Sequence, residues 1–141
     1  MNSKGFRIFS CSLLLVAALT LACAGGAKAG GINSGQFVTY TQGDWGAGGV
    51  AASLLSADYG SVYAGTSGEL IVGVTGISGQ YALAFSSALT TLDYLPAIGT
   101  PGPLTTNLAN PATTPSGTFG GDVVALALNL DFNKAGYSRY V

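Results

Sequence analysis

Short apolar runs alternate with polar and glycine-rich stretches along the chain, a pattern that predicts several short elements joined by long connections. Three of the runs are predicted to form strands: 36–41, which is rich in β-branched and aromatic residues, and the runs 70–74 and 80–85. The glycines of 76–79 suit a turn between the last two runs, because glycine adopts positive φ without a steric cost.

Two other segments have apolar residues at helical spacing. Residues 50–59 carry them on one side and are followed by Gly60, which is predicted to end the helix. A second helix is expected to begin at a capping serine, Ser86 or Ser87, and to end before Pro96. Between the first strand and the first helix, the glycine-rich stretch 43–49 is predicted to be a loop.

The second half of the chain is harder to assign. Residues 97–117 hold four of the five prolines and are predicted to be a long loop, with one helical turn near 104–108. Residues 122–133 alternate apolar and polar positions as a strand does, yet Val123, Ala127 and Leu130 share one helical face. Alanine and leucine favour helix, so helix is preferred, with Asp122 at its positive end.

The N-terminal segment, 1–29, has the three parts of a secretory signal peptide. A basic start is followed by the apolar run 8–24 and by a small-x-small motif that ends at Ala29, so cleavage is predicted between Ala29 and Gly30. Residues 21–23 also resemble a lipoprotein box, and lipid anchoring through Cys23 is the alternative. Both interpretations place the protein outside the cytoplasm, secreted or at the cell surface.

The remaining segment, 30–141, is expected to be a single secreted domain. A segment of this length is enough to enclose one hydrophobic core. The predicted fold class is α+β: a small domain in which a few antiparallel strands pack with two or three short helices. No run in it approaches the roughly 20 apolar residues of a membrane-spanning helix, so no transmembrane segment is expected.

Composition limits the chemistry of this domain. It has no histidine and no cysteine, and two basic residues against six acidic ones give a formal net charge of −4. A Ser-His-Asp triad, a thiolate nucleophile and the common zinc ligands are therefore excluded, and no catalytic residue, metal site or cofactor is predicted. A nucleic-acid partner is not expected, because a basic surface is missing.

Aromatic residues are the one positive sign of a binding site. Trp45, the single tryptophan, lies in a glycine-rich stretch shortly after Tyr40. If these rings are exposed, they form a platform on which a sugar could stack. The competing interpretation is that Trp45 fills the core, because a small domain needs its largest side chains buried.

Three motifs together resemble an uncharacterised module of secreted bacterial surface proteins. They are Thr-Gln-Gly-Asp-Trp-Gly at 41–46, Leu-Pro-Ala-Ile-Gly-Thr-Pro-Gly at 95–102 and Leu-Ala-Leu-Asn-Leu-Asp-Phe at 126–132. The resemblance implies export and an envelope or matrix setting, and no reaction. The expected function is that of a secreted, non-enzymatic surface or extracellular-matrix protein. The alternative is a module that binds a surface polysaccharide through exposed aromatic residues. Self-association is a further expectation.

Overall fold

The computed structural model describes residues 37–137, which belong to one compact unit, Ile32–Val141. The predicted signal peptide, its cleavage site between Ala29 and Gly30, and Cys23 lie outside the described residues. In chain order the elements are α1 (Gln42–Gly46), α2 (Val50–Val62), the 3-10 turn η1 (Ala64–Thr66), β1 (Leu70–Gly73), β2 (Ala82–Phe85), α3 (Ala88–Tyr94), β3 (Leu108–Ala109) and α4 (Gly117–Ala135).

The predicted α+β class is confirmed: four helices pack with one small sheet in this part of the chain. The β1–β2 hairpin is antiparallel, as expected, with Leu70 opposite Phe85. The third strand was not predicted, and β3 pairs with β2 in parallel, Leu83 opposite Leu108. Two asparagines support this short pairing, because Asn107 Oδ1 accepts from Ala82 N at 2.9 Å and Asn110 N donates to Ala84 O at 2.7 Å.

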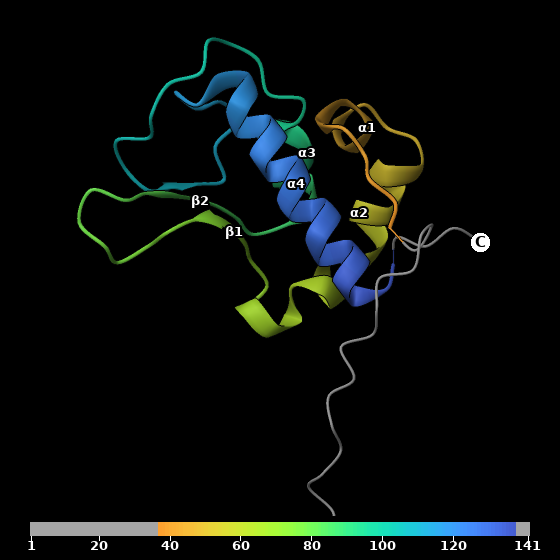
Figure 1. The fold of residues 1–141 in the computed structure, drawn as a ribbon. Coiled ribbons are helices and arrows are strands. Elements are labelled where there is room, and N and C mark those ends of the chain that lie inside the picture. Colours follow the sequence, from red (N-terminus) through yellow and green to blue (C-terminus); the bar gives the residue numbers. More distant parts are fainter. Residues whose placement is uncertain (1–36, 138–141) are drawn as a thin grey trace, which may run out of the picture. The chain divides into compact units, whose positions relative to one another are not determined.

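The ambiguous segment 122–133 is helical and forms most of α4, which begins at Gly117, before Asp122. Asp122 therefore does not open the helix as predicted. Figure 1 shows α4 (blue) lying across the domain, with α1 and α2 on one side and the β1–β2 hairpin on the other. One face of α4 is buried through residues such as Val124 and Leu128, while Leu126 and Leu130 on the opposite face are exposed. Apolar residues on both faces explain the double periodicity in the sequence.

The segment before α1 is extended but is not a strand of the sheet, so the strand predicted over 36–41 is wrong. Its backbone pairs with side chains of α4 instead. Asn129 accepts from Tyr40 N at 2.9 Å and donates to Tyr40 O at 2.8 Å, and Asn133 pairs with Val38 N at 3.2 Å and Val38 O at 2.7 Å. We call residues 37–41 the strap.

Helix α1 replaces the first part of the loop predicted over 43–49. Thr41 and Asp44 form a capping box: Asp44 N donates to Thr41 Oγ1, and Thr41 N donates to the Asp44 carboxylate at 2.8 Å. This box satisfies backbone groups at the start of a helix too short to be stable alone. Gln42 then ties α1 to the rest of the domain, because it accepts from Ala97 N and donates to Asp122.

The remaining elements follow the sequence more closely. Helix α2 forms as predicted but continues past Gly60 to Val62, and α3 begins after Ser87, whose hydroxyl accepts from Thr90 N. Residues 97–117 are mostly loop, and the helical turn expected near 104–108 does not form. The core lies between α4, the sheet and the first three helices; its largest fully buried side chains are Trp45, Tyr94, Phe85, Phe132, Leu55, Leu70 and Leu128.

Candidate functional site

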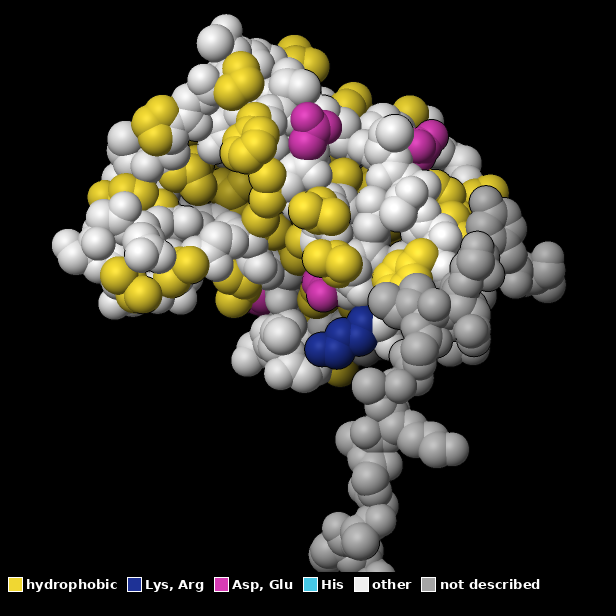
Figure 2. All heavy atoms as spheres, in the orientation of Figure 1, with side chains coloured by type: hydrophobic (Ala, Val, Ile, Leu, Met, Phe, Trp, Pro, Cys, Tyr) yellow, Lys and Arg dark blue, Asp and Glu magenta, His cyan; other side chains and the backbone are white. Residues whose placement is uncertain are grey.

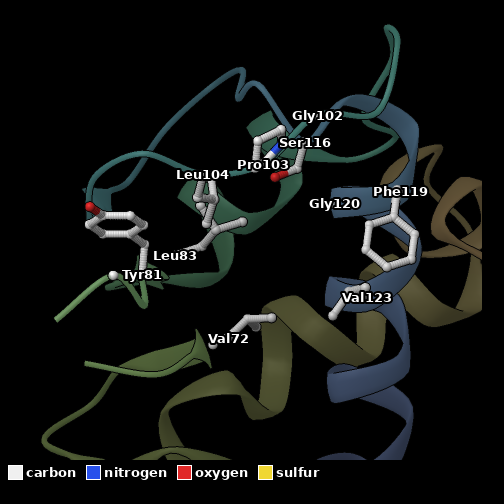
Figure 3. A pocket seen from close by; sticks show the side chains of 12 residues that line it. Val72, Tyr81, Leu83, Gly102, Pro103, Leu104, Ser116, Phe119, Gly120 and Val123 are labelled. Carbon is white, nitrogen blue, oxygen red and sulfur yellow. The ribbon is translucent and has the colours of Figure 1, made fainter. Parts of the chain in front are cut away.

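A hollow of about 330 Å³ lies at the N-terminal end of α4. We call it the chamber. Three parts of the chain enclose it: the β1–β2 hairpin, the proline-rich loop and the first turns of α4 (Figure 3). Its lining residues are Val72, Gly73, Gly79, Tyr81, Leu83, Gly102, Pro103, Leu104, Ser116, Phe119, Gly120 and Val123.

Glycines bring the proline-rich loop close enough to α4 to form the chamber. Gly117 has φ of +51°, and a Cβ there would overlap the backbone of Gly99. The same contact is fixed by Thr118, whose N–H and hydroxyl both donate to Gly99 O, at 3.1 and 3.2 Å. At Gly120 a Cβ would collide with the hydroxyl of Tyr94. Side chains at these positions would push the loop and helix apart.

The chamber has an apolar lining with few polar groups. Valine, leucine, proline and phenylalanine side chains make up most of its walls, and none of its lining residues carries a carboxylate or a basic group. The nearest acid along α4, Asp122, points to another face, where it accepts from Gln42 Nε2 at 2.9 Å. A charged group placed in the chamber would therefore find no oppositely charged partner among the lining residues.

Ser116 is the unusual polar residue of the chamber. It occupies the N-cap position of α4 and is 7% exposed, yet its side chain makes no capping bond and no other hydrogen bond with a described residue. Its helical φ and ψ of −73° and −12° explain this, because a capping serine normally has extended backbone. Figure 3 shows the Ser116 side chain at one end of the chamber.

The backbone at the start of α4 is also incompletely paired. Among the first four N–H groups of the helix, those of Gly117, Thr118 and Gly120 donate to carbonyls of Thr114, Gly99 and Ser116. The N–H of Phe119 has no such backbone partner in the described residues. This is the N3 position, which a capping serine would ordinarily satisfy. One hydroxyl and one N–H at the same helix end are thus left available.

Behind Gly120, a buried tyrosine supports the chamber wall. The Tyr94 hydroxyl lies 3.2 Å from Thr114 Oγ1, and Thr114 Oγ1 accepts from Ser116 N at 3.3 Å. Burial raises the pKa of Tyr94 above that of a free tyrosine, and the hydrogen bond with Thr114 opposes this only in part. The phenol therefore stays protonated and holds the turn that carries Ser116.

A second hollow, of about 310 Å³, lies near the C-terminal end of α4 between Val62, Tyr63, Thr66, Asp131, Lys134 and Ala135. The Tyr63 hydroxyl donates to Asp131 at 3.2 Å. Burial first, and then the negative charge of Asp131, raise the pKa of Tyr63 well above its ordinary value. This hollow differs from the chamber in its lining, which carries both a carboxylate, Asp131, and a basic group, Lys134.

The aromatic residues predicted to stack on a ligand do not form an exposed platform. Trp45 is fully buried at 0% exposure, and its ring lies 5.3 Å from both Tyr40 and Phe132. The alternative interpretation, a core tryptophan, is the one that the structure bears out, because α1 turns the side chain inward under the strap. Tyr40 is half-buried with its edge against Trp45.

The six acidic residues do not converge either. No group of three or more His, Cys, Asp or Glu side chains able to hold a metal occurs within residues 37–137. Asp44 belongs to the capping box, where its hydrogen bonds with Thr41 lower its pKa, and Asp122 and Asp131 bond Gln42 and Tyr63. These three carboxylates thus have roles in holding the fold.

Sequence reasoning missed Ser116, Phe119 and Val123 as site residues. One signal was present: Phe119, Val123, Leu126 and Leu130 follow a 4-3-4 spacing, which marks a second apolar face on α4. On the face of the molecule in Figure 2, hydrophobic side chains (yellow) gather along α4 and beside it over the hairpin. The enclosure of the chamber by the proline-rich loop left no comparable trace in the sequence.

No family model matches the chain, and no similar protein was found among the curated proteins or the solved structures. Within the described residues, none of the helices combines the length and the apolar character needed to cross a bilayer.

Proposed function

We propose that this is an exported, non-enzymatic binding protein of the cell surface or its matrix, and that the chamber is its working surface. The observation that carries the proposal is an apolar chamber of about 330 Å³ with an uncharged lining, built from three separate parts of the chain. Ligand sites are concave, mostly apolar and equipped with few polar groups, as this one is. The pattern of the N-terminal segment 1–29 and the resemblance to secreted surface proteins support the location.

The location is tested by intact mass spectrometry of the protein from fractions of its native host. A soluble extracellular species that begins at Gly30 is the expected result. A lipid-modified species that begins at Cys23 would place the protein on a membrane surface instead, and a full-length cytoplasmic species would contradict export.

The binding role is tested with a neutral apolar fluorophore, N-phenyl-1-naphthylamine, whose emission increases in apolar surroundings. We expect saturable binding by the protein and its loss in Val123→Phe, which fills the chamber from α4. Leu126→Phe is the matched control, because it adds the same ring on the exposed face of the same helix outside the chamber. Equal binding by all three proteins would show that the chamber is not the site.

A second candidate function is self-association through the outer face of α4. Phe119, Leu126 and Leu130 are each more than half exposed there. With Val123 they form a 4-3-4 spacing that is the same in both directions, so an antiparallel second copy would place Phe119 opposite Leu130 and Val123 opposite Leu126. Light scattering after size exclusion tests this: a dimer lost in Leu126→Asp supports it, and a monomer at the highest soluble concentration contradicts it.

The polysaccharide alternative now depends on other aromatic residues than Trp45. Phe119, which is 61% exposed, and Tyr81 lie at the chamber and could contact a sugar ring. Retention on insoluble cell-wall polysaccharide that disappears in Phe119→Ala would support this role. The absence of retention by the unmodified protein would remove it.

A further inference from the structure

We propose that the ligand of the chamber is an aliphatic chain of about eight to ten non-hydrogen atoms that ends in one oxygen acceptor, such as a ketone, an ester carbonyl or a carboxylate. The proposal rests on the proposed function, because it names the ligand class for the same chamber. Three properties of the chamber support it: its volume, its uncharged lining and the unpaired donors at the start of α4.

The volume sets the size of the ligand. A water molecule occupies about 30 Å³ in the liquid, and a methylene group is of similar size. A chamber of about 330 Å³ therefore holds roughly ten such groups when it is filled. This is near the lower limit for small-molecule sites and too small for a folded partner or a sugar chain to enter.

The lining determines the body of the ligand. Val72, Leu83, Leu104 and Val123 present aliphatic side chains to the chamber, and the Phe119 ring lies on the α4 side of it (Figure 3). A polar body would lose its hydrogen bonds to water and find few replacements here, at a cost that apolar groups do not have. An ammonium group is excluded for a second reason, because the N-terminal end of α4 carries partial positive charge.

Ser116 and Phe119 determine the end group. Ser116 is more than nine-tenths buried and lines the chamber, and its hydroxyl has no partner among the described residues. Its hydroxyl oxygen is still open to solvent, since the one sealed side-chain polar atom without a partner in residues 37–137 is Trp45 Nε1. The Ser116 hydroxyl can therefore exchange water in the chamber for an oxygen of a ligand. The Phe119 N–H at the same helix end is a second donor. An oxygen acceptor at this end of the chamber can accept from the hydroxyl and is also favoured by the helix dipole.

The test compares two ligands of the same shape. Octan-2-one carries a carbonyl oxygen, and 2-methyloct-1-ene has a methylene group in its place. Their dissociation constants are measured by ligand-observed NMR for the species that begins at Gly30 and for its Ser116→Ala and Ser116→Thr variants. Loss of a neutral hydrogen bond weakens binding by about 2- to 12-fold. We expect this loss for the ketone in Ser116→Ala, recovery in Ser116→Thr, and no change for the alkene.

The outcomes separate this inference from the function on which it rests. If Ser116→Ala affects ketone and alkene alike, while Val123→Phe abolishes binding of both, the chamber is the site but the acceptor assignment is wrong. If neither ligand binds although the fluorophore does, the ligand class is wrong. Tighter binding of octylamine than of octan-2-one would also overturn the assignment of an oxygen acceptor. Octanoate tells a carboxylate end group from a neutral carbonyl. If octanoate binds more tightly than octan-2-one and its binding depends on Ser116, the end group is a carboxylate. If octanoate binds more weakly, the end group is a neutral carbonyl.

Discussion

Asn129 holds the strap on α4, and its replacement should be among the most costly changes outside the apolar core. The geometry explains why. Four residues of a helix advance about 6.0 Å, and two residues of an extended chain advance about 6.6 Å. Asn129 and Asn133 are four apart on α4, and Tyr40 and Val38 are two apart on the strap. Each amide therefore meets one N–H and one C=O, as a neighbouring strand would.

The expected cost of Asn129→Ala follows from these bonds. Two hydrogen bonds to Tyr40, at 2.9 and 2.8 Å, are lost. Each contributes about 0.5–1.5 kcal/mol, and leaving the half-buried backbone groups of Tyr40 without partners adds to this. We expect the free energy of unfolding to fall by about 2–4 kcal/mol. Leu130→Ala, on the exposed side of the same helix, should cost less than about 1 kcal/mol.

Urea unfolding followed by tryptophan fluorescence measures this directly. Trp45 is the single tryptophan, is fully buried and lies beneath Tyr40, so its emission reports the strap as well as global unfolding. The reasoning would be refuted if Asn129→Ala cost less than a single ordinary hydrogen bond contributes, about 0.5 kcal/mol. Such a result would mean that the strap does not depend on these bonds.

Asn129→Asp gives the same test a pH axis. A carboxylate at this position still accepts from Tyr40 N–H but places an oxygen against Tyr40 C=O. The folded state therefore raises the pKa of the new Asp above the unfolded value of about 3.9. The stability that the protonated form provides is present below that pH and lost as pH rises through the folded pKa. Relative to the unmodified protein, Asn129→Asp should be least stable at neutral pH and recover in acid.

Three further predictions concern single positions. Gly46→Ala should lower the free energy of unfolding by more than about 3 kcal/mol or prevent folding, because its Cβ would overlap the backbone of Leu95. Gly60 has open space around it, so Gly60→Ala should stabilise α2 by about 0.5–1 kcal/mol in the same urea assay. Ser116→Ala should change the free energy of unfolding by less than about 0.5 kcal/mol, because the Ser116 side chain makes no capping bond. Replacing an N-cap serine by alanine usually costs about 1 kcal/mol. A cost of that size would show that the hydroxyl is bonded within the protein. The pKa of Tyr63 is raised in the folded state, so the free energy of unfolding should fall as pH rises above about 10, the pKa of an unfolded tyrosine. Chemical denaturation at about pH 8 and about pH 11 measures this fall, which should be smaller in Tyr63→Phe.

The elements that the sequence predicted well are those governed by local rules. The Ser87 side chain caps α3 by accepting from the backbone N–H of Thr90, three residues away, and the β1–β2 hairpin joins two short apolar runs across a glycine turn. Helix α2 exceeded its predicted end at Gly60, because one glycine costs only about 1 kcal/mol when the rest of the helix is packed. The assignment of residues 122–133 stayed open because both faces of α4 are apolar, so that periodicity alone could not decide between helix and strand.

The candidate site could not be predicted in the same way. For Trp45 the sequence allowed two interpretations, an exposed stacking platform or a core residue. The choice depended on α1, a short helix that the glycine-rich sequence did not indicate. Ser116 looked like any loop serine. Its significance comes from its helical backbone, its burial and the missing capping bond, none of which a sequence pattern records.

The sequence by itself therefore determined the fold class, the hairpin, the capped helix α3, the lack of histidine in the chain and of cysteine in residues 30–141, and an N-terminal segment with the pattern of an export signal. The tertiary structure decided what the strap pairs with, which way Trp45 points and where an apolar chamber forms. The physical reason is the range of the interactions. Caps, turns and periodicity act within a few residues, whereas the bonds from Asn129 to Tyr40 and from Thr118 to Gly99 join segments 89 and 19 residues apart.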